Sequence, residues 1–280
     1  MLRLLLWLVL AGVSCMATAA QDTSRVVALG GDVNATIWML DAGDRVVGVD
    51  STSEWPAAAT ELPDVGYLRQ LQTEGILSLR PGRVIASHDA GPPLVLRQLR
   101  QAGVEVDLLE EARDAAAVLA NIRRIGQWLG REARAEKLAA DLERRYAALA
   151  TAVKAMPRHP RVLFLMATGN GSPMAAGRDT AADRAIALAG GRNVGAGFDG
   201  YKPVSAESLA GMAPEVIVLM REFEQAAGGM QGVLRQPGVA QTPAGRTKRI
   251  LFVDGQALLG FGPRNAEAEQ RLQRHLAARP

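Results

Sequence analysis

Residues 114–155 contain no proline and only two glycines, and this uninterrupted segment limits what the chain can fold into. Apolar residues recur there at steps of three and four, as on one face of a helix. They are Val118, Ile122, Ile125, Leu129, Leu138, Leu142, Tyr146, Leu149 and Val153. The second half, residues 131–155, predicts one long amphipathic helix that ends at the two prolines of "MPRHP" (156–160).

Short apolar runs alternate with helical patterns on both sides of that helix. The runs lie at 25–30, 45–50, 83–87, 104–109, 161–166, 216–218 and 249–254. Strands that alternate with helices form mostly parallel sheets covered on both faces. We therefore predict an α/β fold of two similar lobes with mostly parallel sheets, joined by one long helix, with a ligand cleft between the lobes.

The predicted organisation has four parts. They are a signal peptide at 1–20, an N-terminal lobe at 21–113, a connecting helical segment at 114–158 and a C-terminal lobe at 159–280.

The first twenty residues have the pattern of a cleavable secretory signal: Arg3, a short apolar run, and small residues ending in "ATAA". The apolar run is too short to favour a membrane span, although a retained anchor is the alternative. We expect cleavage after Ala19 or Ala20 and export to the periplasm. Lipid attachment at Cys15 is disfavoured, because Gly12, and not a large aliphatic residue, lies three positions before it.

Composition argues against several classes of function. Cys15 is the only cysteine, so the mature chain has no thiolate for catalysis or for zinc. The formal charge is +3 and the charged residues are interspersed, which argues against a nucleic-acid partner. The sequence has no G-x-S-x-G elbow, no phosphate-binding G-x-x-x-x-G-K-[ST] loop and no H-E-x-x-H motif, so no enzyme class is indicated.

A sparse pattern occurs twice, about 130 residues apart: a Gly-Tyr pair, then a glutamate, then a proline seven residues after the glutamate. The copies are Gly66-Tyr67, Glu74 and Pro81, and Gly200-Tyr201, Glu207 and Pro214. This separation is too long for a stacked repeat and favours two lobes of similar build.

Tyr67 lies in a predicted loop between a strand and a short helix, where α/β folds present ligand-binding groups. In an extended segment Arg69 points to the same side, and a nearby cation favours phenolate over phenol. Phenolate is a hard oxygen donor, and tyrosine is a known protein ligand of haem iron. The alternative is a packing tyrosine whose hydroxyl bonds to the backbone.

Three other side chains have two interpretations each. Glu74 and Glu207 open the short helices of their lobes, where they complement the helix dipole or present one carboxylate per lobe to arginines of a partner. His88 follows a predicted strand and is either a cleft ligand or a polar loop residue.

Five blocks resemble the periplasmic haem-binding proteins of bacterial haem-uptake ABC transporters. These are "GGDV" (30–33), the run 48–81, "AGPP" (90–93), "GYKPVSAESL" (200–209) and "LLGFGPR" (258–264). The resemblance spans nearly all of the mature chain, and "DVGYLRQL" is its most specific part. The wider class, in which a rigid helix joins the lobes, also includes siderophore and vitamin B12 carriers.

The resemblance implies roles for individual residues. Tyr67 matches the axial ligand of ferric haem iron, and Arg69 matches the arginine of the same motif. Arg221 matches an arginine that supports the phenolate in some members. Glu74 and Glu207 match the paired glutamates that dock on the permease.

The resemblance also places Tyr201 and Lys202 on the C-lobe rim of the cleft, where Lys202 meets a haem propionate. Members that stack two haems use an added histidine after the first C-lobe strand. Ala167 and Thr168 occupy that region here, so we expect one haem and not two.

The resulting hypothesis is a monomeric carrier that takes up haem in the periplasm and delivers it to an inner-membrane ABC permease with its ATPase, catalysing no reaction. An outer-membrane haem receptor system would act upstream, and the rigid helix implies small lobe motions. One alternative is a siderophore or cobalamin carrier. The other is an exported enzyme that uses Tyr67 or His88 as acid–base.

Overall fold

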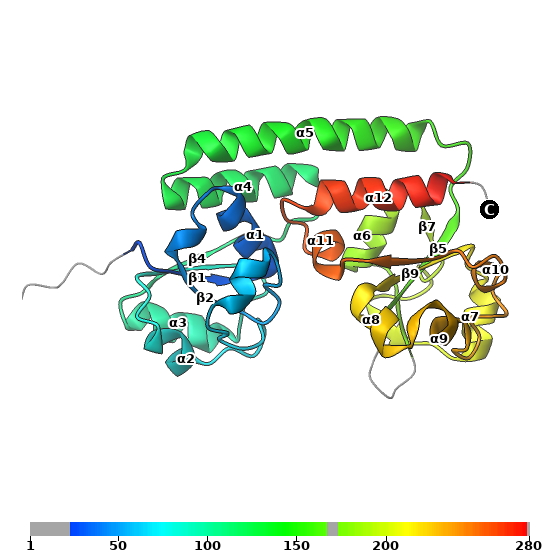
Figure 1. Cartoon of the computed structure of the whole chain (residues 1–280), viewed down its shortest axis with the longest axis horizontal. Coiled ribbons are helices and arrows are strands. Elements are labelled where there is room, and N and C mark those ends of the chain that lie inside the picture. The colour runs from blue at the N-terminus through cyan, green and yellow to red at the C-terminus, as the bar shows by residue number, and fades with distance from the viewer. Residues whose placement is uncertain (1–22, 167–172, 279–280) are drawn as a thin grey trace, which may run out of the picture.

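The computed structural model of the protein describes residues 23–166 and 173–278. It has two lobes side by side, with one long helix, α5 (Glu132–Lys154), lying across both (Figure 1). The predicted signal peptide lies outside the described residues. Within the described ranges, no helix has the length and apolar character needed to cross a membrane.

The N-lobe is built on a four-stranded sheet whose neighbouring strands are all parallel, in the order β2-β1-β3-β4. Its strands are β1 (Val26–Leu29), β2 (Val46–Val49), β3 (Arg83–Ala86) and β4 (Glu105–Leu108). Between them lie α1 (Gly31–Met39), α2 (Thr73–Ser78), α3 (Pro93–Gln101) and the 3₁₀ turns η1 (Gly43–Arg45) and η2 (Ala57–Glu61). Every residue of β1 is buried, as an apolar run covered on both faces requires.

The C-lobe sheet is mixed, in the order β10-β9-β5-β6-β8 with β7 beside β5. Its strands are β5 (Arg161–Met166), β6 (Met174–Ala176), β7 (Arg192–Asn193), β8 (Tyr201–Pro203), β9 (Val216–Met220) and β10 (Ile250–Val253). The strands predicted from apolar runs, β5, β9 and β10, are parallel, and only β6 and β8 run antiparallel to their neighbours. Both lobes therefore have the mostly parallel sheets that the alternating pattern predicted.

The remaining C-lobe helices surround this sheet. They are α6 (Ala181–Leu188), α7 (Ala206–Met212), α8 (Arg221–Ala226), α9 (Gly229–Leu234), α10 (Pro243–Arg246), α11 (Gly255–Leu259) and α12 (Asn265–Ala277). The short helices α8 to α11 and the short strands β6 to β8 were not predicted, because segments of two to six residues are too short to show a period.

The predicted helical connection is a pair of helices packed against each other. α4 (Ala115–Leu129) lies along the N-lobe, and Gly130 ends it in the left-handed conformation at φ 64°, so that α5 can run back across both lobes. Over the C-lobe, α5 packs on α12, and the buried Tyr146 hydroxyl of α5 donates to Asn265 Oδ1 at 2.8 Å. This packing supports the long helix along most of its length (Figure 1).

Replacing Asp114 with alanine should lower the free energy of unfolding by about 1 kcal/mol, because Asp114 Oδ1 accepts the Ala117 amide and caps α4. Asp141→Ala on α5 is the matched control. It removes only exposed ion pairs with Arg144 and Arg145, which are worth less than about 0.5 kcal/mol. Urea unfolding of both variants measures the difference. An equal decrease in the free energy of unfolding for both would show that the Asp114 cap does not stabilise the protein more than an exposed ion pair does.

The two copies of the repeated sequence pattern adopt related backbones. Gly66 and Gly200 both have positive φ, 96° and 72°, a conformation that favours glycine, and each places the tyrosine that follows it. Glu74 and Glu207 then lie in the first turns of α2 and α7, and both are exposed. Both helices lie on the side of the lobes away from α5 (Figure 1).

Candidate functional site

A cleft of about 770 Å³ lies between the lobes. Its N-lobe wall is formed by residues that follow the carboxyl ends of the parallel strands: Gly30 after β1, Ser51 and Thr52 after β2, Ser87, His88 and Asp89 after β3, and Glu111 and Ala112 after β4. From the C-lobe, Met166 and Met220 line it at the ends of β5 and β9. Carboxyl ends of parallel strands are where open α/β sheets bind ligands, and the volume suits a cofactor-sized molecule.

Tyr67 lines this cleft and is 40% exposed, so it is not a buried packing residue. Its hydroxyl oxygen accepts a hydrogen bond of 2.5 Å from Arg69 Nη1. Arg69 Nη2 in turn donates to Asp89 Oδ2 at 2.5 Å. Arg69 thus reaches the tyrosine oxygen, as the sequence predicted, but not through an extended segment. Residues 67–70 form a turn in which the Gln70 amide donates to the Tyr67 carbonyl at 2.8 Å, and a carboxylate on the neighbouring loop holds the guanidinium in place.

The charge on Arg69 is secured by these partners. Partial burial alone would lower its pKa, but the charge of Asp89, its hydrogen bond and the interaction with Tyr67 outweigh burial and raise the pKa of Arg69 above its ordinary value. The guanidinium therefore stays positive next to the phenol oxygen at every pH of interest. A cation fixed at this point can offset negative charge that a bound ligand brings next to it.

Apolar side chains cover much of the cleft wall. Leu68 and Ala112 come from the N-lobe side and Met166, Ala181, Met220, Leu259 and Phe261 from the C-lobe side. Facing walls of this kind can bury the flat apolar faces of a macrocycle, while the polar groups at the edges orient it.

Tyr201, the second tyrosine of the repeat, also lines the cleft but is half-buried. Burial raises the pKa of the Tyr201 hydroxyl above its usual value, although the Ala182 amide and the Thr180 hydroxyl act in the opposite sense. The two tyrosines of the repeat are therefore not equivalent: Tyr67 is open to a ligand and Tyr201 contacts the start of α6.

Two residues that the sequence resemblance assigns to the binding site lie outside the described lining of the cleft. Lys202 is exposed, and its Nζ lies 5.5 Å from the centroid of the Phe198 ring. Arg221 begins α8 and is also exposed. Ala167 and Thr168 lie outside the described residues.

Sequence reasoning missed Asp89, Glu111 and Arg184 as cleft residues. Asp89 and Glu111 follow strands β3 and β4, and that position was the available signal for both. Arg184 lies inside α6, and no local pattern distinguishes it from other helical arginines. In the described part of the chain, no group of three or more His, Cys, Asp or Glu side chains is arranged to hold a metal ion.

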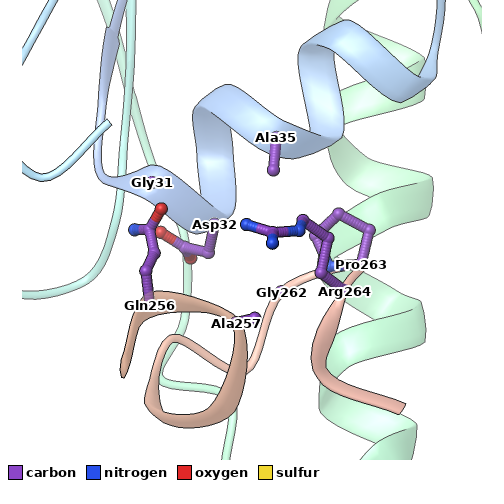
Figure 2. Close-up of a pocket in the computed structure, with 8 residues that line it drawn as sticks. All are labelled: Gly31, Asp32, Ala35, Gln256, Ala257, Gly262, Pro263 and Arg264. Carbon is purple, nitrogen blue, oxygen red and sulfur yellow. The ribbon is translucent and has the colours of Figure 1, made fainter. Parts of the chain in front are cut away.

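The lobes touch each other at the inner end of the cleft, where α1 meets α11 (Figure 2). A Cβ atom at Gly31 would lie 1.5 Å from Gln256 Nε2, so any larger residue at this position would displace the Gln256 side chain. Nearby, Arg264 pairs with Asp254 at 2.5 Å and its guanidinium carbon lies 5.1 Å from the centroid of the Trp55 ring in the other lobe. These contacts fix the cleft on its inner side.

Asp32 stands at this contact, facing Gln256 in Figure 2. Burial raises the pKa of the Asp32 carboxyl from 3.8 to about 7 against a backbone hydrogen bond from Val33, and the charges of Asp89 and Asp50 add to the rise. The folded protein therefore holds this proton more tightly than the unfolded chain does. The contribution is present below pH 4 and is lost as the pH rises toward 7.

We expect the free energy of unfolding of Asp32→Asn to fall less than that of the parent protein between pH 5 and pH 8. Each unit of pKa difference corresponds to about 1.36 kcal/mol, so the effect is measurable by urea unfolding at the two pH values. Parallel curves for the two proteins would show that Asp32 does not titrate as described.

Residues 26–257 match the periplasmic binding protein family. The chain belongs to the periplasmic binding protein family. A cobalamin-binding protein of Halobacterium salinarum is 30% identical over 262 residues, which cover 91% of this chain and 70% of that protein.

Solved structures of this family agree with the fold. The periplasmic haem-binding protein RhuT from Roseiflexus sp. RS-1, in apo form, is 40% identical with a TM-score of 0.86, covering 90% of this chain and 97% of that chain. The periplasmic haem-binding protein BhuT, in complex with two haems, is 41% identical with a TM-score of 0.84 and the same coverage. A periplasmic haem-binding protein from Pseudomonas aeruginosa is 37% identical with a TM-score of 0.82, covering 91% and 92% of the two chains.

The family and these neighbours are binding proteins and not enzymes. The present chain is accordingly a binding protein of the two-lobed periplasmic type, and the enzyme alternative raised by the sequence is wrong.

Proposed function

We propose that this protein binds ferric haem in its cleft through a Tyr67 tyrosinate and delivers it to an inner-membrane ABC permease with its ATPase. The observation that carries the proposal is the exposed Tyr67 hydroxyl in the cleft, with Arg69 donating to its oxygen at 2.5 Å. An oxygen donor paired with a fixed cation suits ferric iron, because the cation offsets the charge of the phenolate.

The solved haem-binding relatives, at 37–41% identity, support haem as the ligand. Cleavage of the first twenty residues and release into the periplasm belong to the same proposal, as do the boundaries at residues 113 and 158. We further propose that the carrier acts as a monomer and that an outer-membrane receptor system supplies it.

Residues at the cleft rim complete the proposed site. Lys202 is exposed on β8, next to Tyr201 in the cleft wall, and its flexible stem allows it to reach a propionate at the opening. Arg221 begins the helix after Met220, which itself lines the cleft, and supports the phenolate in the loaded protein.

A cobalamin carrier is the second candidate, favoured by the 30% identity to the cobalamin-binding protein of Halobacterium salinarum. Tyr67 and Arg69 argue against it, because the cobalt of a cobalamin already carries its own axial ligands, whereas ferric haem iron has an open axial position for a protein oxygen. The two candidates thus differ in whether the tyrosine oxygen matters for affinity.

Titration of the purified mature protein with hemin, and separately with cyanocobalamin and a ferric hydroxamate, tests the proposal. We expect a saturable shift of the Soret band that ends at one hemin per protein, and no saturable change with the other two ligands. Saturation with cyanocobalamin but not hemin would contradict haem as the ligand. A break at two hemins, the state in which BhuT was solved, would contradict only the expected stoichiometry.

A further inference from the structure

A second arginine lines the cleft on the C-lobe side. Arg184 lies four residues after Thr180, whose hydroxyl caps the start of α6. Its Nη1 donates to Glu111 Oε1 at 2.9 Å. Because Glu111 follows β4 and Arg184 belongs to the C-lobe, this ion pair joins the two lobes at the cleft wall.

Glu111 does not depend on Arg184 alone. Its other oxygen, Oε2, accepts from Arg113 Nε at 2.8 Å and Nη2 at 2.5 Å. Hydrogen bonds from Arg113, together with those from Arg184, hold the pKa of the Glu111 carboxyl below its usual range. If Arg184 turned to another carboxylate, Glu111 would still be paired with Arg113, so its negative charge would not be left without a partner.

The three side chains carry two positive charges and one negative charge. Asp179 also lines the cleft and helps to raise the pKa of Arg113, but among the described residues it forms no ion pair with either arginine. Arg184 is four-fifths buried, and in the described part of the chain only its Nη1 is engaged by a side chain. Its remaining guanidinium N–H groups are available for a second acceptor.

The described cleft lining contains five carboxyl side chains, so a carboxylate of the ligand needs a cation beside it in the wall. The five are Asp32, Glu54, Asp89, Glu111 and Asp179. The lining contains two arginines, Arg69 and Arg184, and no lysine. Arg69 is already committed to Tyr67 and Asp89. A ferric porphyrin that brings two propionates into this cleft therefore finds one further cation in its wall, which is Arg184.

We propose that Arg184 binds one carboxylate of the ligand, a porphyrin propionate, while Arg113 keeps the Glu111 carboxylate paired. The assignment rests on the proposed haem-binding function. It makes the cleft selective for an acidic porphyrin over a macrocycle of similar size whose edge carries neutral amides or esters. Those groups cannot form the charge-assisted paired hydrogen bonds that a guanidinium makes with a carboxylate.

Titrations with hemin and with hemin dimethyl ester, whose propionates are uncharged, test this subsite. The parent protein should bind hemin at least about tenfold more tightly than the diester, the factor expected for one charge-assisted contact, because the diester loses the contact with Arg184 as well as the one proposed for Lys202. Arg184→Met should lower hemin affinity by about tenfold and leave diester affinity unchanged. Arg184→Lys should restore part of the preference for hemin over the diester, because lysine keeps the positive charge but cannot form the paired hydrogen bonds of a guanidinium.

Two further variants separate ligand binding from lobe structure. Glu111→Gln weakens the competitor of the propionate and should raise the affinity for hemin but not for the diester. Arg178→Met is the matched control: Arg178 is exposed, pairs with Asp199 and lies outside the described cleft lining, so both affinities should stay at parent values. Thermal melting of each variant checks that the fold is retained.

The outcomes distinguish this proposal from the function on which it rests. If the parent binds neither porphyrin, the haem-binding function fails and the subsite fails with it. If the parent binds hemin and diester equally, or if Arg184→Met weakens both ligands alike, haem binding stands and the subsite is wrong. Loss of hemin affinity in Glu111→Gln would show that the ion pair serves to hold the lobes and not to receive the ligand.

Discussion

Replacing Tyr67 with phenylalanine should lower the affinity for hemin by at least about 100-fold while leaving the fold intact. The phenyl ring keeps the contacts of the side chain, and only the oxygen that Arg69 supports is lost. Loss of the groups that merely surround a metal ligand already costs 10–100-fold in affinity, so loss of the ligand atom should cost at least as much. Tyr67 is exposed, so the substitution leaves no cavity and the thermal midpoint should not change.

His88→Ala and Tyr201→Phe are the controls for this measurement. Both residues line the same cleft as Tyr67, and both side chains are of kinds that bind haem iron in proteins. The half-buried Tyr201 contacts the start of α6, and His88 is a polar loop residue in this account, so each variant should keep hemin affinity within about threefold of the parent, roughly 0.6 kcal/mol. A large loss in either control, with Tyr67→Phe unaffected, would move the iron ligand to that residue.

Reversing the charges of Glu74 and Glu207 together should abolish haem delivery without changing haem binding. The two carboxylates are exposed in the first turns of α2 and α7, one on each lobe, away from the cleft lining and from α5. One carboxylate per lobe fits a transporter with an arginine on each half, and a lysine at either position places like charges together, which costs several kcal/mol. We therefore expect haem-stimulated ATPase activity in reconstituted vesicles to fall at least about tenfold for Glu74→Lys/Glu207→Lys, with single variants intermediate.

Glu143→Lys serves as the control for charge reversal, because Glu143 is exposed on α5, on the opposite side of the molecule. It should stimulate the ATPase as the parent does. Full stimulation by the double variant would show that these glutamates serve their helix N-termini and not a partner.

The sequence predicted the framework of this fold because its signals are long or repeated. The residues of α5 recur at helical spacing over more than twenty positions, and β1, β5 and β9 are apolar runs covered on both faces. The Tyr67–Arg69 contact was also predicted, but from an extended segment that the structure does not have. A turn closed by the Gln70 amide and the Tyr67 carbonyl brings the two side chains together instead.

The rest of the site depends on contacts that no local pattern encodes. Asp89 is 20 residues from Arg69, and Arg184 is 73 residues from Glu111, so each pair exists only once the lobes have formed. The predicted similarity between Tyr67 and Tyr201 extends to the backbone, because both follow a glycine with positive φ. Their surroundings differ, because β8 is a three-residue strand whose pairing with β6 turns Tyr201 toward α6.

The central claim is that Tyr67 binds the iron of haem as a tyrosinate. Resonance Raman spectra of the hemin-loaded parent protein, excited in the phenolate-to-iron charge-transfer band, test it most directly. The account predicts tyrosinate ring modes that are present in the parent and in His88→Ala and absent in Tyr67→Phe. Hemin-loaded parent protein without tyrosinate modes, or with modes that persist in Tyr67→Phe, would contradict it.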